Sequence, residues 1–547
     1  MKKCLRRKNC VRPSVERLES RKLLAALLGG NDLTESLWSF PDRASTPPEL
    51  TPGIRATDFR LATLDGAKVQ SYLSSVPANL DDSIASNSTL AIPRPDGTFE
   101  RFQIYVSSIM EPELAAKFPE IQTYAGQGID DPASTVRFDV TPHGFHAQVR
   151  SPSGAYYIDP YSNLPSNFYA VYARGSGPRP VFEELETQDI LAGLGQLSGG
   201  EPPSANSGPT YANRSGAELR TFRLAVAATG EYTAFHGGTV ALGQAAIVTA
   251  VNRLAGIYQT EMSISFRLVA NNDQLVYTNA ATDPYTNNNG FTMLGENQAN
   301  VDRVIGSANY DMGHVFSTGG GGVAALASVG VDRIKAQGVT GLPTPIGDEF
   351  YVDYVAHEMG HQFGGNHTFN SNAGSCQGNR NTSTAYEPGS GTTIQAYAGI
   401  CDSDDLQRNS DPYFHSASLD EFVRHVDVTI PRVGTRTQTG NNIPIINAGP
   451  NFTIPASTPF VLTAVGSDAD VGDRLTYDWQ QRDLGPTQTV AAADNGLGPL
   501  FRVWSPTTDP SRTFPRLSDL VNNRTAVGEK LPTTNRQMNF RVIARDN

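Results

Sequence analysis

Residues 357–367 read His-Glu-Met-Gly-His-Gln-Phe-Gly-Gly-Asn-His, and this stretch decides how the chain around it folds. His357 and His361 are four residues apart, so in a helix both imidazoles lie on one face and can converge on one metal ion. Gly364 predicts the end of that helix, because glycine adopts a left-handed backbone without a Cβ clash. The reversed chain then brings in His367 as a third ligand, and a set of three histidines predicts a zinc site.

Glu358 stands directly beside the first of these histidines. Three protein ligands leave the fourth position of a tetrahedral Zn²⁺ open for water, whose pKa falls to about 7 on the metal. A carboxylate next to that water can accept its proton and pass it to a leaving amine. We therefore expect Glu358 to act as general base and then general acid in a zinc-dependent endopeptidase. The competing interpretation, histidines spaced by chance, is disfavoured by the number of fixed positions.

The bulk composition describes a large, turn-rich and acidic protein. A chain of 547 residues is too long for one ordinary core, so several domains are expected. Only 18% of the residues are charged, and the 51 Gly and 36 Pro indicate many turns, as in exported globular proteins. The net charge of -12 is uneven, because residues 1–22 hold nine Lys or Arg against two Glu. The remaining body is strongly acidic, which argues against nucleic acid as a partner.

The N-terminus predicts an export leader. A basic start is followed by a short apolar run at residues 23–28, and residues 15–25 resemble a leader found on exported bacterial proteins. The apolar run is far shorter than the ~20 residues that a membrane span requires, and no other segment qualifies. We expect a secreted or cell-surface protein with no transmembrane anchor. A disordered basic tail is the alternative interpretation of this segment.

Four cysteines occur, two of them, Cys4 and Cys10, in the basic leader. Cys376 and Cys401 are the remaining pair, and they flank the segment just after the zinc motif. Export to an oxidising space favours a disulfide between them. A pair of buried free thiols is the alternative.

Composition and pattern divide the rest of the chain. Strand-like runs dominate the N-terminal part, strands and helices alternate after a Gly/Pro-rich separator, and short strands with frequent turns follow. Because the chain stops directly after a strand-like run, we expect the last module to be incomplete. The predicted segments are an export leader at 1–30, a linker at 31–54, a β-rich domain at 55–184, a linker at 185–215, an α/β domain at 216–436 and a β-sandwich module at 437–547.

From about residue 216 to residue 430 the chain resembles a metzincin of the reprolysin-like (adamalysin-like) bacterial type. The extended zinc pattern carries this resemblance, and the match continues through residues 366–370, 386–391 and 397–401. The resemblance implies a zinc metalloendopeptidase that acts on proteins or peptides. It also implies that the N-terminal β-rich domain is similar to a reprolysin-type propeptide.

Two positions depart from the family pattern. Metzincins place a methionine in a tight turn beneath the zinc histidines, and Gln395 stands at that place. A buried glutamine amide needs hydrogen-bond partners, at a cost of about 1 to 3 kcal/mol if they are missing. Reprolysins often follow the third histidine with Asp, whereas this chain has Thr368. Gln395 is thus the sign of the rival hypothesis, an inactive metzincin-like pseudoenzyme that acts as a surface adhesion or binding module.

Tyr397 occupies the position at which astacin- and serralysin-type metzincins carry a tyrosine near zinc. By analogy it donates a hydrogen bond to the oxyanion, and the alternative is a packed core tyrosine. The propeptide-like region contains no cysteine, so a thiolate on zinc cannot keep the enzyme latent. Candidates for another blocking group are Asp130, Asp131, His143 and His146, which are otherwise ordinary surface residues.

Two weaker signals concern other ligands. Residues 323–327 are a candidate edge strand that pairs with an extended substrate backbone; a plain loop with a buried strand is the alternative. Asp468, Asp470 and Asp473 have oxygen-ligand spacing suited to Ca²⁺. A solvated acidic turn explains the same residues.

Overall fold

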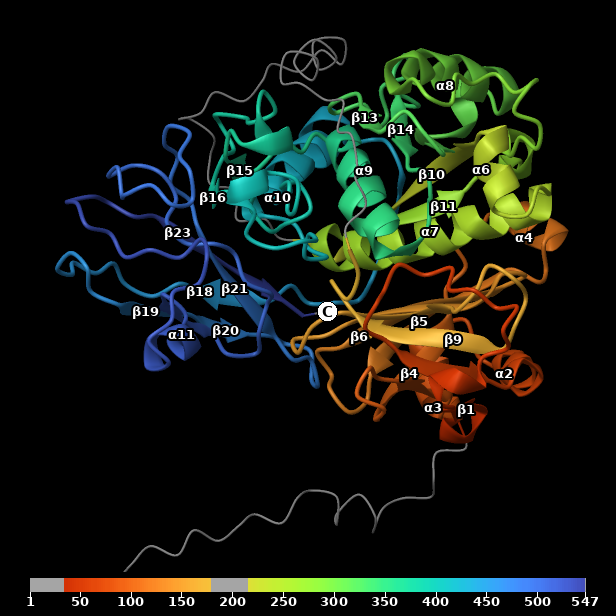
Figure 1. Ribbon diagram of the computed structural model, residues 1–547, viewed down its shortest axis with the longest axis horizontal. Helices are drawn as coiled ribbons and strands as arrows, with labels where there is room; N and C mark the ends of the chain where they lie inside the picture. Colours follow the sequence, from red (N-terminus) through yellow and green to blue (C-terminus); the bar gives the residue numbers. More distant parts are fainter. Residues whose placement is uncertain (1–33, 179–214, 547) are drawn as a thin grey trace, which may run out of the picture.

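The computed structural model describes residues 34–178 and 215–546, which form three regions (Figure 1). An N-terminal β-rich domain lies against a central α/β domain, and a C-terminal β-rich region lies beside both. The predicted leader at 1–30 and the predicted linker at 185–215 lie outside the described residues, apart from Ser215. The predicted multidomain architecture with a β-rich N-terminal region is confirmed.

The N-terminal domain is one antiparallel sheet of nine strands, in the order β1-β2-β9-β8-β7-β6-β5-β4-β3. Alternating large apolar residues build its core, among them Phe102, Phe138 and Phe145. The short helices α2 (Gly66–Leu73), α3 (Leu80–Ser86) and α4 (Pro112–Lys117) lie in its connections. The strands are β1 (Trp38–Ser39), β2 (Arg60–Leu64), β3 (Thr89–Pro93), β4 (Phe99–Val106), β5 (Gln122–Gly128), β6 (Thr135–Thr141), β7 (Gly144–Arg150), β8 (Tyr156–Pro160) and β9 (Phe168–Ala173).

Part of the predicted linker at 31–54 belongs to this domain instead. Strand β1 pairs with β2, and the Trp38 side chain is buried. Its ring packs edge-on against Phe145 and Tyr169, and its Nε1–H donates to the carbonyl of Ala91. The Pro, Ser and Thr content of this segment indicates a linker, but one buried tryptophan ties it to the sheet.

The central domain is built on a mostly parallel sheet in the order β11-β10-β12-β14-β13, with β17 paired antiparallel to β10. Because β17 joins this sheet, the domain extends past the predicted boundary at residue 436. The strands are β10 (Glu218–Ala228), β11 (Ile264–Leu268), β12 (Met312–Ser317), β13 (Gly322–Ala324), β14 (Gly338–Gly341) and β17 (Thr435–Gln438). The helices are α6 (Gly230–Phe235), α7 (Val240–Met262), α8 (Gly290–Val304), α9 (Ala356–Gln362) and α10 (Ser416–Val423).

Helix α7 is covered on both sides. It begins after Thr239, whose hydroxyl accepts from the Leu242 N–H, and it ends at Ser263 in the left-handed conformation. One side of the helix packs on the central sheet and the other on β5, β6 and β7 of the N-terminal domain (Figure 1). Among the described residues α7 is the one helix long and apolar enough to cross a membrane, yet its apolar window is 83% buried inside the fold. We assign it to the core, as expected for a largely apolar helix that is covered on both sides.

Buried polar contacts join α7 to the N-terminal sheet. The Arg253 guanidinium forms an ion pair with Asp159, and the Tyr172 hydroxyl donates to the same carboxylate at 2.5 Å. Asn252 donates to the Phe138 carbonyl at 2.9 Å, and the Thr249 hydroxyl donates to Asp139 at 2.9 Å. The two domains therefore form one unit with specific, fully buried bonds between them.

The C-terminal region is β-rich, and its described strands pair in twos. An aromatic cluster that includes Trp479, Phe501 and Phe514 forms its core. The strand pairs are β18 (Ile445–Asn447) with β20 (Val465–Ser467), β19 (Phe460–Thr463) with β22 (Ser511–Phe514), and β21 (Thr476–Gln481) with β23 (Phe540–Arg545).

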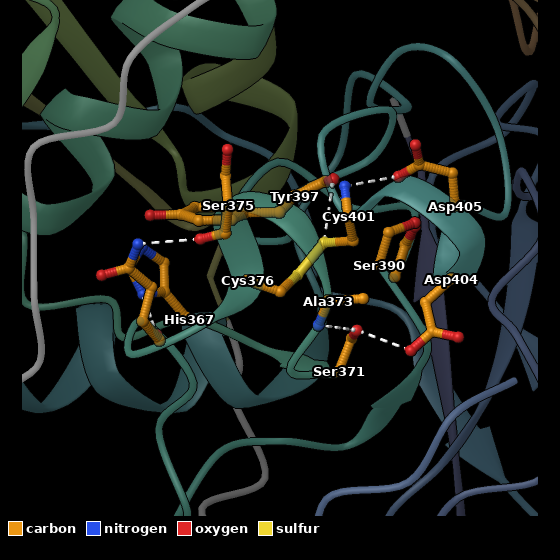
Figure 2. Close-up of a disulfide and its surroundings, with 12 residues drawn as sticks. His367, Ser371, Ala373, Ser375, Cys376, Ser390, Tyr397, Cys401, Asp404 and Asp405 are labelled. Carbon is orange, nitrogen blue, oxygen red and sulfur yellow. Dashed lines mark hydrogen bonds between the residues drawn. A yellow bond between two sulfur atoms is a disulfide. The ribbon is translucent and has the colours of Figure 1, made fainter.

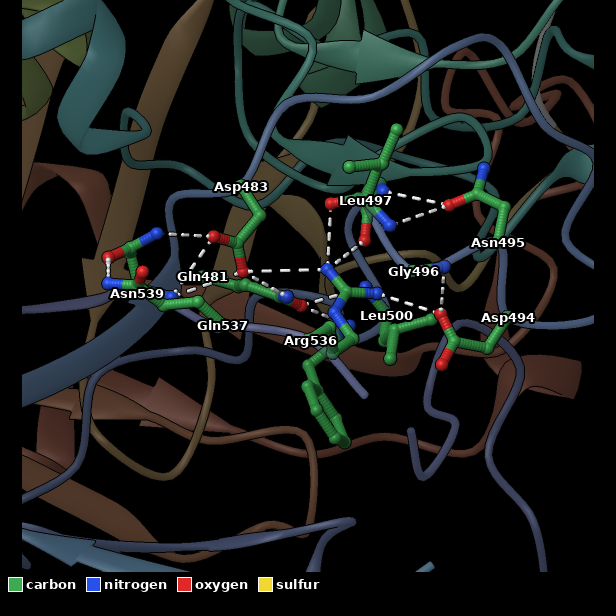
Figure 3. A network of polar contacts seen from close by, with 12 residues as sticks. Gln481, Asp483, Asp494, Asn495, Gly496, Leu497, Leu500, Arg536, Gln537 and Asn539 are labelled. Carbon is green, nitrogen blue, oxygen red and sulfur yellow. Dashed lines mark hydrogen bonds and ion pairs between the residues drawn. The ribbon is translucent and has the colours of Figure 1, made fainter. Parts of the chain in front are cut away.

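A buried arginine organises the loops of this region (Figure 3). The Arg536 guanidinium is about 1% exposed and lies 2.9 Å from Asp494, and it also donates to the carbonyls of Leu497 and Gly498. Asp483, at the end of β21, lies 3.7 Å away. The network holds a long connection in one conformation without regular secondary structure.

We predict that Asp159→Asn destabilises the protein. Arg253 is about 1% exposed, so the change leaves a buried charge without its ion-pair partner, at a cost of about 3 to 5 kcal/mol. Chemical denaturation measures the change in the free energy of unfolding. Asp130→Asn is the matched control, because Asp130 pairs with Arg101 at the surface and the loss there is expected to stay below about 1 kcal/mol. Equal losses of unfolding free energy in the two variants would contradict the prediction that the buried Arg253–Asp159 pair contributes more than the surface pair.

Candidate metal centre

The helix that carries the first two histidines is continuous with a π-helical turn. Residues Glu349–Val355 form this turn, and α9 follows directly at Ala356. Beyond the end of α9, Gly364 has a φ of +99°, and its N–H donates to the His361 carbonyl at 2.8 Å. The turn predicted at Gly364 is therefore present, and it reverses the chain toward His367.

The structure brings the three predicted ligands together. The Nε2 atom of His357 lies 2.9 Å from that of His361 and 3.3 Å from that of His367. Zinc–nitrogen bonds of about 2.0 to 2.1 Å in a tetrahedral site separate the ligand atoms by roughly 3.3 Å. The three nitrogens thus stand at about the spacing that one Zn²⁺ ion requires.

The other nitrogen of each ring is held by a backbone carbonyl. The Nδ1 atoms of His357, His361 and His367 lie 2.6, 2.6 and 2.7 Å from the carbonyl oxygens of Ile394, Gly365 and Asn379. A carbonyl can only accept, so each Nδ1 carries the proton and each Nε2 presents its lone pair to the shared centre. Three lone pairs at this separation repel one another unless a cation lies between them, so the residues fit a bound metal ion.

Burial favours the neutral form of two of these rings. It lowers the pKa of His361 to about 4, and it lowers that of His367 well below the ordinary value, with a further contribution from the two neighbouring imidazoles. Metal binding requires the neutral form of histidine, which the lowered pKa values of His361 and His367 favour. Glu358 lies on the same helix and is fully buried with them.

A family model described as metallo-peptidase family M12B, reprolysin-like, matches residues 218–422. These residues are a reprolysin-like metallopeptidase domain. M12B metallopeptidases use zinc, and the three histidines lie within the matched residues. No curated protein matches the chain. Among solved structures, metalloproteinase-II from Bacteroides fragilis is similar at 9% identity and a TM-score of 0.31, with 65% of this chain and 97% of that chain covered.

Gln395 lies beneath the histidines of the reprolysin-like domain, at the predicted place. Its side chain is fully buried, and its Nε2 lies 3.4 Å from the Gly365 carbonyl. Within the described residues, its Oε1 has no hydrogen-bond partner. This oxygen faces Gly360, where an added Cβ would collide with it. Gly360 within the zinc motif therefore makes room for the glutamine.

Glu387 is a site residue that sequence reasoning missed. Its carboxylate is fully buried and accepts from the Thr368 hydroxyl at 2.6 Å and from the Thr392 N–H at 2.7 Å. The Thr393 hydroxyl donates to it as well. One carboxylate thus ties the residue after the third ligand to the turn that supplies the Ile394 carbonyl. Burial raises its pKa, while these donors oppose the shift.

A second buried carboxylate lies on the other side of the third ligand. Glu421, on α10, accepts from the Asn366 N–H at 2.8 Å and from the Asn366 side-chain amide at 2.6 Å. Burial raises its pKa to about 7. His367 is therefore flanked by two residues that are each bonded to a buried carboxylate. The Asp that reprolysins often carry after the third histidine is replaced by Thr368 together with the carboxylate of Glu387.

A disulfide closes the loop that completes the site (Figure 2). Cys376 and Cys401 are bonded, with their Cα atoms 5.3 Å apart, so the predicted disulfide forms. The loop between them carries Asn379, whose carbonyl accepts from His367, and Tyr397. The Tyr397 ring is buried and its centroid lies 4.6 Å from that of His367. The predicted catalytic role of Tyr397 stays a prediction.

The candidate blocking groups in the N-terminal domain make other contacts. Asp130 pairs with Arg101, and Asp131 accepts from the Ala133 N–H at 3.1 Å. His143 lies 2.9 Å from the Leu242 carbonyl, and His146 lies 3.0 Å from Asp139. These four residues support the structure of the N-terminal domain and its junction with α7.

The predicted calcium site is partly assembled. Oxygen atoms of Asp468, Asp470 and Asp473 lie within 4.8 Å of one another. Asp470 already accepts two hydrogen bonds from Asn442, at 2.7 Å each. An acidic turn held by hydrogen bonds from Asn442 explains this geometry, and calcium stays a prediction.

We predict that Gln395→Met stabilises the reprolysin-like domain. The change removes a buried carbonyl oxygen that lacks a partner and keeps nearly the same volume, which is worth about 1 kcal/mol or a rise in Tm of about 2–4 °C. Thermal denaturation of the metal-free and zinc-loaded protein measures it, with zinc content as a check that the ligands are intact. A lower Tm would show that the amide contributes more than it costs.

We predict that Glu387→Gln weakens zinc binding by about 10- to 100-fold. Mutation of residues that hold metal ligands in position typically lowers metal affinity by this factor. The introduced amide presents N–H groups to donors that need an acceptor. Competition with a chromophoric chelator measures the affinity. Asp478→Asn is the matched control, since Asp478 is a buried carboxylate of the C-terminal region that bonds to Gln480. Unchanged zinc affinity in Glu387→Gln would show that Glu387 does not support the metal site.

Proposed function

We propose that this protein is a secreted zinc endopeptidase in which Glu358 moves the proton during peptide hydrolysis. The observation that carries the proposal is the convergence of three imidazole lone pairs at 2.9 and 3.3 Å. Each ring is fixed by a carbonyl bond, and Glu358 stands on the helix between two of the ligands. This is a preorganised metal site with a carboxylate beside it, the arrangement that hydrolytic chemistry requires.

Bound zinc supplies a Lewis acid and lowers the pKa of a water molecule. With zinc held by the three histidines, Glu358 would accept a proton from the attacking water as its oxygen bonds to the substrate carbonyl carbon. The same carboxyl then donates the proton to the amide nitrogen as the carbon–nitrogen bond breaks. Tyr397, packed against His367, is proposed to donate to the oxyanion that develops in between.

The proposed substrate is an extended polypeptide. Strand β13 is the last strand of the central sheet within the described chain, pairs antiparallel with β14 and packs beside α9. A substrate backbone added along β13 would run beside the zinc helix and present a peptide bond to it. This supports cleavage within chains, because such pairing does not require a free terminus.

We propose that the intact chain is a latent form. His357, His361, His367 and Glu358 are each at most 1% exposed, so a polypeptide reaches them only after the site opens. The N-terminal domain is proposed to be the propeptide-like part. Its described contacts include α7, β11 and the loop at 409–411, which supports a role in holding the enzyme fold together.

Two further features support the proposal. The disulfide between Cys376 and Cys401 favours an oxidising compartment, as expected for export. The C-terminal region, proposed to be a β-sandwich module, supports the outer wall of the site. Its Gly485 carbonyl accepts from Arg380 at 2.6 Å, and its Arg502 donates to the Leu406 carbonyl at 3.2 Å.

We predict that Glu358→Ala lowers proteolytic activity by about 10²- to 10⁴-fold without loss of bound zinc, because it removes the group that transfers the proton. The full chain is assayed on casein, directly and after limited proteolysis, with a chelator control. Asp130→Asn is the matched control and should keep wild-type activity. If the wild-type chain binds one zinc per molecule and cleaves nothing in either state, the protein is a binding or adhesion module.

A further inference from the structure

We propose that a cavity between the three regions of the chain is a binding site for a small ligand that carries an oxyanion group. The cavity has a volume of about 650 Å³, within the range of small-molecule sites. Strands β6 and β7 of the N-terminal domain form one wall, the C-terminal half of α7 forms another, and β23 forms a third. The site is separate from the three zinc histidines, which do not line it.

Two arginines face this cavity from neighbouring strands. In the register of β6 and β7, Arg150 stands opposite Thr135, and Arg137 is two residues further along β6. Successive side chains alternate across a strand, so the two arginines share one face of the sheet. Diagonal neighbours of this kind are about 7 to 8 Å apart, which lets two guanidinium groups reach one ligand.

Neither arginine has an acidic partner within the described residues. Arg137 is 8% exposed and donates to the Ser107 hydroxyl at 2.8 Å and to the Gln259 side-chain carbonyl. Arg150 donates to the Thr260 hydroxyl at 2.6 Å and to the Thr135 hydroxyl at 3.2 Å. All four acceptors are neutral.

The other arginines of the cavity differ in this respect. Arg541 lies 2.8 Å from Asp420, and Arg545 lies 2.6 Å from Glu261. Asp546, also in the wall, accepts from Asn441 at 2.8 Å. These carboxylates thus have other hydrogen-bond partners. Glu261 attracts Arg150 through space but is bonded to Arg545, and neither Arg137 nor Arg150 forms an ion pair within the described residues.

Such charges are costly unless an anion compensates them. Burial lowers the pKa of Arg150 to about 10 and also lowers that of Arg137, yet both guanidinium groups stay charged at neutral pH. A buried guanidinium is stabilised by a paired and hydrogen-bonded anion. Its planar fork matches the oxygen atoms of phosphate, sulfate and carboxylate groups.

The backbone of α7 leaves room for the Arg137 side chain. A Cβ at Gly256 of α7 would lie 2.7 Å from the Cγ of Arg137. The glycine therefore lets the arginine stem pass between the sheet and the helix. A glycine within a helix weakens it by about 1 kcal/mol, and here the cost is offset by the position that it permits for Arg137.

The test is saturable anion binding by the full chain. Isothermal titration calorimetry and thermal denaturation are carried out with inorganic phosphate, sulfate or citrate at constant ionic strength in chloride. We expect at least one of these probes to bind saturably and raise Tm. A response to phosphate or sulfate alone assigns a tetrahedral oxyanion, and a response to citrate alone assigns a carboxylate ligand.

We expect Arg150→Gln and Arg137→Gln to weaken that binding at least tenfold and to abolish the rise in Tm. Arg101→Gln, which removes an arginine paired with Asp130 on the same sheet, should bind as the wild type does. If Arg137→Gln fails to fold, the wild-type titration and Arg150→Gln decide the matter. The absence of saturable binding in the wild type, or unchanged binding in Arg150→Gln, overturns the proposal.

Discussion

Three hydrogen bonds from imidazole Nδ1 groups to backbone carbonyls constrain the rest of the metal site. The acceptors belong to Gly365, Asn379 and Ile394, which come from three separate turns of the chain. The lone pairs converge only if all three turns are held at once. The positive φ of Gly364 fixes the first turn, the Cys376–Cys401 disulfide closes the loop of the second, and the Glu387 carboxylate fixes the third.

The domains also depend on contacts between segments that are distant in sequence. Helix α7 is largely apolar and buried along most of its length, so it needs a cover on the face that the central sheet leaves exposed. The N-terminal sheet supplies this cover, and the Arg253–Asp159 pair adds specificity to it. The N-terminal domain is thereby a structural part of the enzyme fold, and the cavity of the arginine pair lies at the junction of all three regions.

Several features could be predicted because they depend on residues close together in the sequence. The spacing of His357 and His361 and the turn at Gly364 belong to this class, as does the position of Gln395. No local sequence pattern predicts the role of Glu387, because its threonine donors lie on different segments. Neighbouring residues do not indicate that a glutamate is buried. Composition places Trp38 in a linker and puts a domain boundary within β17, because the partners of both are distant in sequence.

The sequence by itself determined the chemistry: a metal-binding helix, a chain reversal, a third ligand and a carboxylate, because helical periodicity and glycine stereochemistry act over a few residues. Only the tertiary structure decided which carbonyls orient the rings, which carboxylates flank His367, and which arginines line the cavity without forming an ion pair. Those outcomes depend on packing between segments more than a hundred residues apart in some cases, and neither spacing nor composition encodes such contacts.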